Sequence, residues 1–236
     1  MIELIRLARS RLSSESAYRE FQRFIAAGLR HELEAKQVQF EGKAVIELGS
    51  GHGGYSDVFS AQTSHYLATD LSFYAGPHGY DKVQLDLANS LPIRDCSFDL
   101  AICCNVIEHL EDSQICLREI RRIIKPGGTL VLTFPPFYSI LMAGGHHFKP
   151  FHFLGEPAAV WIYNKLHRTH IANYKTSFGA FGLYPLTIAS VRRQILSAGL
   201  TIVQEFTRMS AVNTMQLPSI AADLFTGHAC FVARKI

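Results

Sequence analysis

The feature that most constrains the fold is an alternation of short apolar runs with helical stretches, which begins after Gly42. The clearest helical stretch, residues 113–124, ends in a Lys-Pro-Gly-Gly turn before the next apolar run. Five runs are predicted to be strands: residues 44–48, 65–70, 83–86, 98–104 and 129–134. This order predicts an α/β protein with a mostly parallel sheet and helices on both faces.

A single domain is predicted over residues 1–236, because a core of this size can bury most of the unfolded surface. Residues 1–40 are interpreted as an N-terminal helical cap. Residues 136–185 interrupt the alternation with Phe, Tyr, His and Gly, and they predict an insertion or lid that contains a helix at 156–173. Residues 186–236 predict a helix that ends at Gly199 and then a strand hairpin.

Composition narrows the partners and the compartment. A net charge of +3 and 18% charged residues are too mild for a phosphate-backbone binder, so no nucleic-acid partner is expected. The five cysteines contain no C-x-x-C pair, which favours a reducing, cytoplasmic location. No apolar run approaches the roughly 18 residues that cross a bilayer, so no integral membrane association is expected. The oligomeric state stays open.

A glycine-rich turn follows the first predicted strand and should open a helix near Tyr55. Gly49, Gly51 and Gly54 also satisfy the G-x-G-x-x-G pattern of dinucleotide-binding folds. Asp70 lies 21 residues beyond Gly49, at the end of the next strand, where a carboxylate can accept both ribose hydroxyls. The turn and the carboxylate therefore predict a nucleoside ligand and leave a nicotinamide-dependent oxidoreductase as an alternative.

Later motifs favour a different nucleoside. Residues 86–99 read DLANSLPIRDCSFD, and Lys-Pro-Gly-Gly follows at 125–128. With the acidic Glu47 before the turn, the chain resembles the type 11 class I S-adenosylmethionine-dependent methyltransferases over residues 45–134. It departs from their pattern by Ile93 in place of Phe and by a longer gap after Asp86. The resemblance implies a seven-stranded Rossmann-like sheet of order 3-2-1-4-5-7-6, with strand 7 antiparallel and residues 43–135 as the cofactor-binding half.

The same resemblance implies which residues bind S-adenosylmethionine. Gly49 and Gly51 would flank its methionine part, and Asp70 would hold the ribose. Asp86, with the Leu87 amide, would read the adenine edge. The full set is Glu47, Gly49, Ser50, Gly51, Asp70, Leu71, Asp86, Leu87 and Asn105, with Leu71 packing on the ring and Asn105 near the ammonium group. The alternative is that Asp70 and Asp86 only form turns at strand ends.

Methyl transfer is an in-line displacement that depends mainly on alignment, and a base matters when the acceptor is a hydroxyl. Histidines follow the fourth and fifth predicted strands, at the edge where open α/β sheets bind ligands. The predicted catalytic candidates are His109, His147 and His152, with His146 in the same cluster. Each could instead be a packing or turn residue.

No metal is predicted, because Asn105 replaces the first acidic ligand of the E-x-x-E-H motif that holds a divalent ion in some methyltransferases. The function expected is methyl transfer to a small-molecule acceptor, by O-methylation. Aromatic residues of the insertion suit stacking on a sugar, an aromatic ring or a lipid-linked group, or they form lid core. A non-catalytic member of the same fold is a further alternative.

Overall fold

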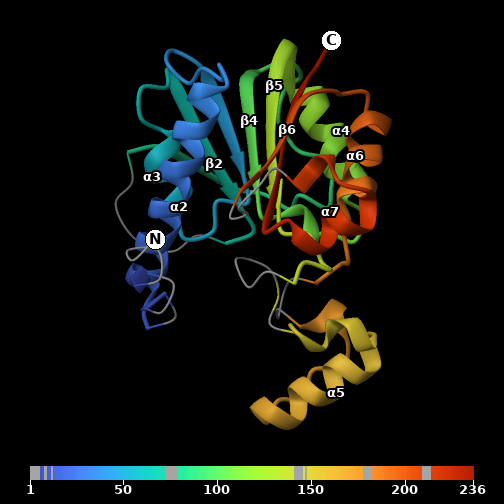
Figure 1. Cartoon of the computed structure of the whole chain (residues 1–236). Helices are drawn as coiled ribbons and strands as arrows, with labels where there is room; N and C mark the ends of the chain where they lie inside the picture. Colours follow the sequence, from blue (N-terminus) through green and yellow to red (C-terminus); the bar gives the residue numbers. More distant parts are fainter. Residues whose placement is uncertain are drawn as a thin grey trace.

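The computed structural model describes residues 6–7, 10–11, 13–72, 79–140, 146, 148–177, 182–208 and 214–236. Its seven-stranded sheet has the order β3-β2-β1-β4-β5-β7-β6 (Figure 1). Strand β7 is antiparallel to β5 and to β6, and the other pairs are parallel. The predicted sheet is thereby confirmed. The strands are β1 Ala44–Leu48, β2 His65–Asp70, β3 Asp81–Gln84, β4 Phe98–Cys104, β5 Ile124–Phe134, β6 Thr201–Arg208 and β7 His228–Arg234.

Two strands differ from the prediction. Strand β3 begins and ends two residues earlier than predicted, and its last residue, Gln84, pairs with Asp70 at the end of β2. Strand β5 begins five residues earlier than predicted, so that the Lys-Pro-Gly-Gly run belongs to the strand. Both glycines of that run bond to the Lys235 backbone, whose carbonyl accepts from the Gly127 N–H at 2.7 Å and whose N–H donates to the Gly128 carbonyl at 3.0 Å. Contacts with the far end of the chain therefore extend β5.

Helices cover both faces of the sheet, as predicted (Figure 1). Helices α2, Glu15–Ala35, and α3, Gly54–Phe59, lie on one face. Helices α4, Ser113–Ile123, α6, Ile188–Ser197, and α7, Ser219–Phe225, lie on the other. The N-terminal segment is more than a cap, because α2 buries a stripe of residues in the core beside β1, β4 and β7: Ile25, Ala26, Leu29 and Leu33.

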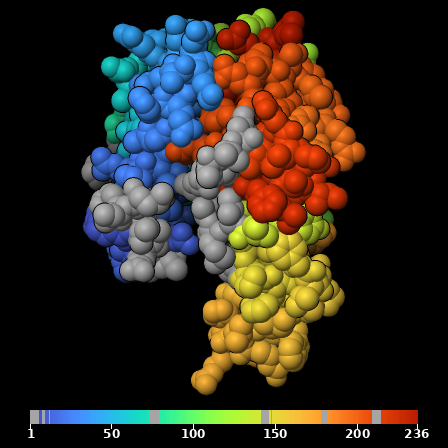
Figure 2. All heavy atoms as spheres, in the orientation of Figure 1, coloured from blue at the N-terminus to red at the C-terminus, as the bar shows by residue number. Residues whose placement is uncertain are grey.

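Residues 148–177 form a lobe that projects beyond the carboxyl edge of the parallel strands (Figures 1 and 2). It contains the short helices η2, Phe151–Leu154, and η3, Tyr174–Thr176, and the longer α5, Glu156–His167. A small apolar cluster of its own includes Phe148, Ala159 and Val160.

Helix α5 ends six residues before the predicted end. Arg168 takes a left-handed conformation, with φ of 54°. The Asn164 side-chain oxygen accepts from Thr169 Oγ1 at 2.8 Å and from the Ile171 N–H at 2.9 Å. These bonds replace the next helical turn, because an Asn side chain offers nearby backbone an alternative partner.

The glycine-rich turn links β1 to α3 within a very narrow space. Gly49 has φ of 76°, and a Cβ atom there would lie 2.3 Å from Cγ2 of Val106, just past β4. A Cβ on Gly54 would lie 2.4 Å from Cβ of Gln22 on α2. Only glycine fits such an approach, so these two positions let the turn lie between α2 and the end of β4.

Glu47 lies behind this turn and joins β1, β2 and α3. Its Oε2 accepts hydrogen bonds from the Tyr66 hydroxyl, at 2.7 Å, and from Ser56. The side chain is 2% exposed, and burial raises the pKa of Glu47 to about 7. Because the carboxyl is directed into the fold, it supports the base of the turn.

Replacing Gly49 with Ala should destabilise the protein more than replacing Gly42 with Ala. Both glycines have a left-handed φ, 76° and 67°, but nothing lies within 4 Å of a Cβ on Gly42. We expect Gly42→Ala to cost about 1–2 kcal/mol from backbone strain. Gly49→Ala should cost about 1–3 kcal/mol more from overpacking against Val106. Urea unfolding of both variants measures the difference, and equal losses would contradict the close approach.

Replacing Glu47 with Gln should give a stability gain that depends on pH. The folded-state pKa of about 7 lies above the ordinary 4.5, so the folded protein binds this proton more tightly than the unfolded chain. The carboxyl therefore lowers stability progressively as pH rises from 4.5 to about 7. Gln keeps an acceptor for Ser56 and Tyr66 without the charge. Urea denaturation across this pH range should show the free energy of unfolding of the variant rising relative to that of the wild type as pH increases. A difference that is independent of pH would exclude a titrating Glu47.

Candidate active site

The carboxyl edge of the sheet gathers the loops that follow β1, β2, β4 and β5. Backbone hydrogen bonds tie these strand ends together. The Leu85 N–H donates to the Asp70 carbonyl at 2.9 Å, and the Asn105 N–H donates to the Thr133 carbonyl at 2.9 Å. Open α/β sheets bind ligands at this edge, where the predicted cofactor residues follow the strands.

The backbone of the glycine-rich turn is already satisfied inside the fold. The Gly49 and Ser50 N–H groups both donate to the Thr69 carbonyl, at 2.8 and 2.9 Å. The Gly51 N–H donates to Asp70 Oδ2 at 2.7 Å. A phosphate-binding turn presents such amides to its ligand. In this turn the three amides are not available to a phosphate, and a Cβ on Gly51 would make only an ordinary contact, 3.9 Å from Nε2 of Gln22.

Asp70 lies at the end of β2 and holds the turn in place. Its second oxygen, Oδ1, accepts from the Ser72 N–H at 3.2 Å. Each carboxylate oxygen can accept more than one hydrogen bond, so the bonds to Gly51 and Ser72 leave capacity for ligand hydroxyls. Leu71, the next residue, is 36% exposed beside it.

Asp86 follows β3 and folds its own loop. Its Oδ1 accepts from the Ala88 N–H at 2.9 Å, and its Oδ2 accepts from the Asn89 side-chain amide at 2.8 Å. The Asp86 side chain is exposed, whereas Leu87 is buried in the core. Asp86 thus forms a turn at the end of a strand, as the alternative interpretation states, and its carboxylate oxygens can still accept hydrogen bonds from a ligand.

Asn105 comes directly after β4 and has an uncommon backbone conformation, with φ of 58°. Its side-chain oxygen is buried and has no hydrogen-bond partner among the described residues. The next residue, Val106, is the one that contacts Gly49. A buried acceptor therefore lies unpaired beside the glycine-rich turn, where it suits a ligand that donates.

The short helix η1, Ile107–His109, carries two titratable side chains beyond β4. Nδ1 of His109 lies 2.8 Å from the Gly182 carbonyl. A carbonyl only accepts, so Nδ1 carries the proton and Nε2 of the neutral ring is an acceptor. Glu108 is 6% exposed, and burial raises its pKa to about 7. Its Oε2 has no hydrogen-bond partner among the described residues.

A ring of aromatic contacts joins the lobe to the sheet, and we call it the neck: Phe137, His146, His152 and Tyr174. His152 is 3% exposed, and its ring centroid lies 5.6 Å from that of Phe137 and 5.0 Å from that of His146. Neither His152 nitrogen has a partner in the described part of the chain, and the Tyr174 hydroxyl is likewise buried and unpaired there.

The electrostatics of the neck favour neutral groups. Burial, reinforced by the nearby Lys149 ammonium, lowers the pKa of His152. The backbone of Tyr138 acts in the opposite direction and raises the pKa of His152, although the two groups do not meet the geometry of a hydrogen bond. Nε2 of His146 lies 3.1 Å from the Phe137 carbonyl. The third predicted catalytic candidate, His147, lies outside the described residues.

The neck and η1 are neighbours. The Leu183 N–H donates to the Tyr174 carbonyl at 3.0 Å, and the Tyr184 N–H donates to the Glu108 carbonyl at 2.8 Å. The structure thus brings His109 and His152 to one region. It adds Glu108 and Tyr174, which sequence reasoning missed as site residues. The adjacent Glu108 and His109 in the sequence were a signal that Glu108 could belong to the site. No such signal exists for Tyr174, because its burial depends on residues that are distant in sequence.

The part of the chain that the structure covers holds neither a metal-binding cluster nor a membrane-spanning helix. No three His, Cys, Asp or Glu side chains among the described residues are grouped so as to hold a metal ion. The absence of a metal requirement stays a prediction. None of the helices in the described segments is long and apolar enough to pass through a bilayer.

Comparison with known proteins agrees with this geometry. Residues 46–132 match the family model described as a methyltransferase domain. An uncharacterized methyltransferase of Mycobacteroides abscessus is 25% identical over 185 residues, which are 74% of this chain and 69% of that protein. Another, from Mycobacterium sp. strain JLS, is 29% identical over 131 residues, 53% of this chain and 51% of that protein. The chain thus spans about half the length of this second relative.

A solved structure extends the similarity to the whole fold. The crystal structure of an S-adenosylmethionine-dependent methyltransferase from Mesorhizobium loti superposes with a TM-score of 0.58 at 20% identity, covering 86% of this chain and 95% of that one. Residues 46–132 thus match a methyltransferase domain, and the fold of the whole chain is shared with an S-adenosylmethionine-dependent methyltransferase.

Proposed function

We propose that the protein transfers the methyl group to a hydroxyl of a small molecule that binds between the carboxyl edge and the neck. The observation that carries this proposal is the set of buried polar atoms without partners in that region, on Glu108, His152 and Tyr174. Buried polar groups ordinarily have hydrogen-bond partners, so three unpaired ones near each other suit a polar ligand.

The cofactor residues follow the predicted set with one change of role. Asp70 would hold the ribose and Leu71 would pack on the ring, while Asp86 and the Leu87 amide would read the adenine edge. The unpaired Asn105 oxygen adds an acceptor for the ammonium group. Glu47 would act through the turn, because its carboxylate is directed toward Ser56 and Tyr66.

S-adenosylmethionine supplies a methyl group that is already activated on a sulfonium, so the chain's task is to align the acceptor and to receive its proton. His109 is the first candidate for the base, because the hydrogen bond from Nδ1 to the Gly182 carbonyl leaves Nε2 as the acceptor. His152 is the second candidate, since its lowered pKa keeps it neutral at working pH.

Asp70→Ala should weaken S-adenosylmethionine binding by about 10-fold to 150-fold, the equivalent of losing about 1.5–3 kcal/mol of hydrogen bonding to a charged group. Titration calorimetry measures the affinity. Asp81→Ala is the matched control, because Asp81 lies at the start of β3 with a side chain that is 74% exposed. Equal affinity in the two variants would place the ribose contact elsewhere.

His109→Ala should lower turnover on a hydroxyl acceptor by roughly 100-fold to 10,000-fold while cofactor affinity persists. The assay supplies methyl-labelled cofactor with pools of hydroxyl, amine and thiol acceptors. The exposed His170 of the lobe provides the control, His170→Ala.

If His109→Ala keeps full turnover and His152→Ala loses it, the base belongs to the neck. If both keep it, alignment alone drives the reaction. Label on amines or thiols only would refute O-methylation, and a protein that binds cofactor without labelling any acceptor would be the non-catalytic alternative.

A further inference from the structure

The lobe exposes large apolar side chains. Leu154, Trp161 and Leu166 are each 63% exposed, and Phe153 is 48% exposed. Exposed single hydrophobic residues are ordinary, but four within one short segment indicate a contact surface. They do not belong to the apolar cluster of the lobe, which is formed by other residues of the segment.

Basic residues accompany them along α5. Trp161 and Lys165 lie one helical turn apart on α5, whereas Leu154 ends η2 and Arg168 is the left-handed residue that follows α5. Lys165 and Arg168 are exposed. Exposed bulky apolar and cationic side chains thus occur together on α5 and at its two ends.

The lobe as a whole has a net positive charge. Residues 148–177 contain four basic residues and a single acidic one, Glu156, so the lobe has the same excess of +3 as the entire chain. The Glu156 carboxylate faces inward, where its Oε1 accepts from the Tyr174 N–H at 2.5 Å. Lys175 pairs with Glu111 of the main domain. The rest of the chain has no net charge, so the excess of +3 belongs to the lobe. Lys149 is partly buried, which lowers its pKa to about 8, whereas Lys165 and Arg168 are exposed.

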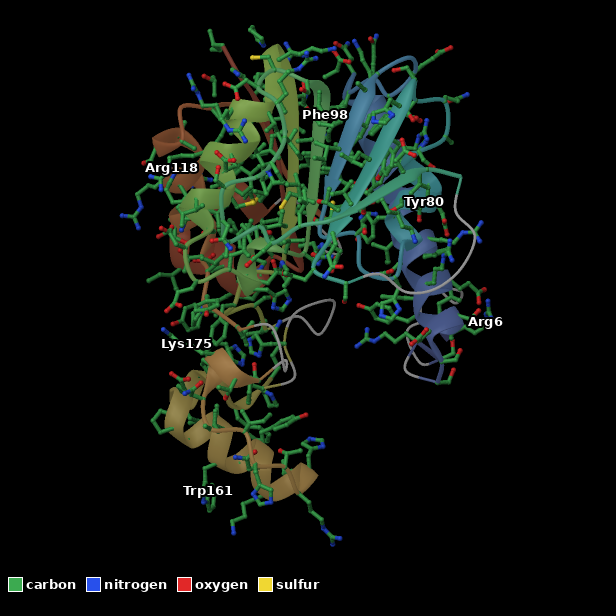
Figure 3. The ribbon with its side chains drawn as sticks, turned by 180° about the vertical axis from the view of Figure 1, so that it is seen from behind. Arg6, Tyr80, Phe98, Arg118, Trp161 and Lys175 are labelled. Atoms are coloured by element: carbon green, nitrogen blue, oxygen red, sulfur yellow. The ribbon has the colours of Figure 1, made fainter. Side chains whose placement is uncertain are left out.

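The lobe is also the part that extends farthest past the carboxyl edge (Figures 1 and 2). Figure 3 shows Trp161 on the outer part of the lobe, away from the sheet, whereas Lys175 lies nearer the main domain. A flat surface could therefore meet this end of the molecule before it met the rest.

We propose that the lobe docks on the surface of a bilayer that contains anionic phospholipids. Tryptophan and leucine side chains enter the boundary between head groups and acyl chains, while neighbouring Lys and Arg contact lipid phosphates. Anionic head groups complement the positive lobe. A second copy of the chain fits less well, because two lobes of like charge would repel. The proposal goes beyond methyl transfer and does not rest on the acceptor's identity.

The chain carries its own probe for the test, because Trp161 is its sole tryptophan. Phosphatidylcholine vesicles with phosphatidylglycerol should shift its fluorescence emission to the blue, and brominated phospholipids should quench it. Vesicles of phosphatidylcholine alone should give a much smaller shift, and added salt should reverse binding through screening.

Leu154→Glu should weaken binding to these vesicles by about tenfold or more. It removes an apolar side chain that would enter the bilayer, and it adds a negative charge that the anionic lipids repel. The control is Leu196→Glu on α6, an equally drastic change at a leucine that is 52% exposed outside the lobe. It should bind like the wild type. Both positions are exposed, so both variants should fold and bind cofactor normally.

Three results would overturn the proposal. The first is an emission spectrum that anionic vesicles leave unchanged. The second is equal loss of vesicle binding in Leu154→Glu and Leu196→Glu, which would place the contact outside the lobe. The third is a dimer without lipid that Leu154→Glu dissociates, which would make the lobe an interface between copies. Failure of methyl transfer to hydroxyl acceptors would leave the vesicle result untouched.

Discussion

The close approach of Gly49 to Val106 is the constraint on which the site depends. A Cβ atom at Gly49 would lie 2.3 Å from the valine side chain, so the turn after β1 can touch the end of β4 only without a side chain. That contact holds the turn beside Asn105 and at the start of η1. It also leaves the Gly51 amide where Asp70 can accept from it, at 2.7 Å.

The same packing explains why the turn suits one nucleoside cofactor more than another. G-x-G-x-x-G sequences bind a pyrophosphate when backbone N–H groups and a helix N-terminus face the ligand. Here the amides of Gly49, Ser50 and Gly51 all bond within the protein. What remains is the Asp70 carboxylate and a buried amide oxygen of Asn105 that has no partner among the described residues. These groups support the proposal that a methionine with a ribose binds here rather than a diphosphate.

The sequence predicted much of the framework because those elements depend on local patterns. Strands β1, β2 and β4 have the predicted bounds, as short apolar runs between turn residues should. The start of β5 was missed, because Lys235 at the other end of the chain holds it. Helix α5 was predicted too long, because Asn164 bonds to residues that should have continued the helix.

The site residues also divide into those that a local pattern predicts and those that depend on distant contacts. Glu47 was recognised from its spacing to the glycines, but its direction into the fold depends on Ser56 and Tyr66, which lie on different elements. Burial of Glu108 and Tyr174 depends on residues 182–184, which bridge η1 and the lobe. No pattern near either residue reports that bridge.

The neck couples the two ends of the insertion. The small core of the lobe includes Phe137 from the strand side and Leu183 from the returning chain, so the lobe is oriented by residues that also surround His152 and Tyr174. A force on the outer face of α5, such as contact with a lipid surface, therefore acts on the same packed rings that border the proposed acceptor site. Because packed interiors transmit strain, we expect docking of the lobe to be coupled to entry of the acceptor at the neck.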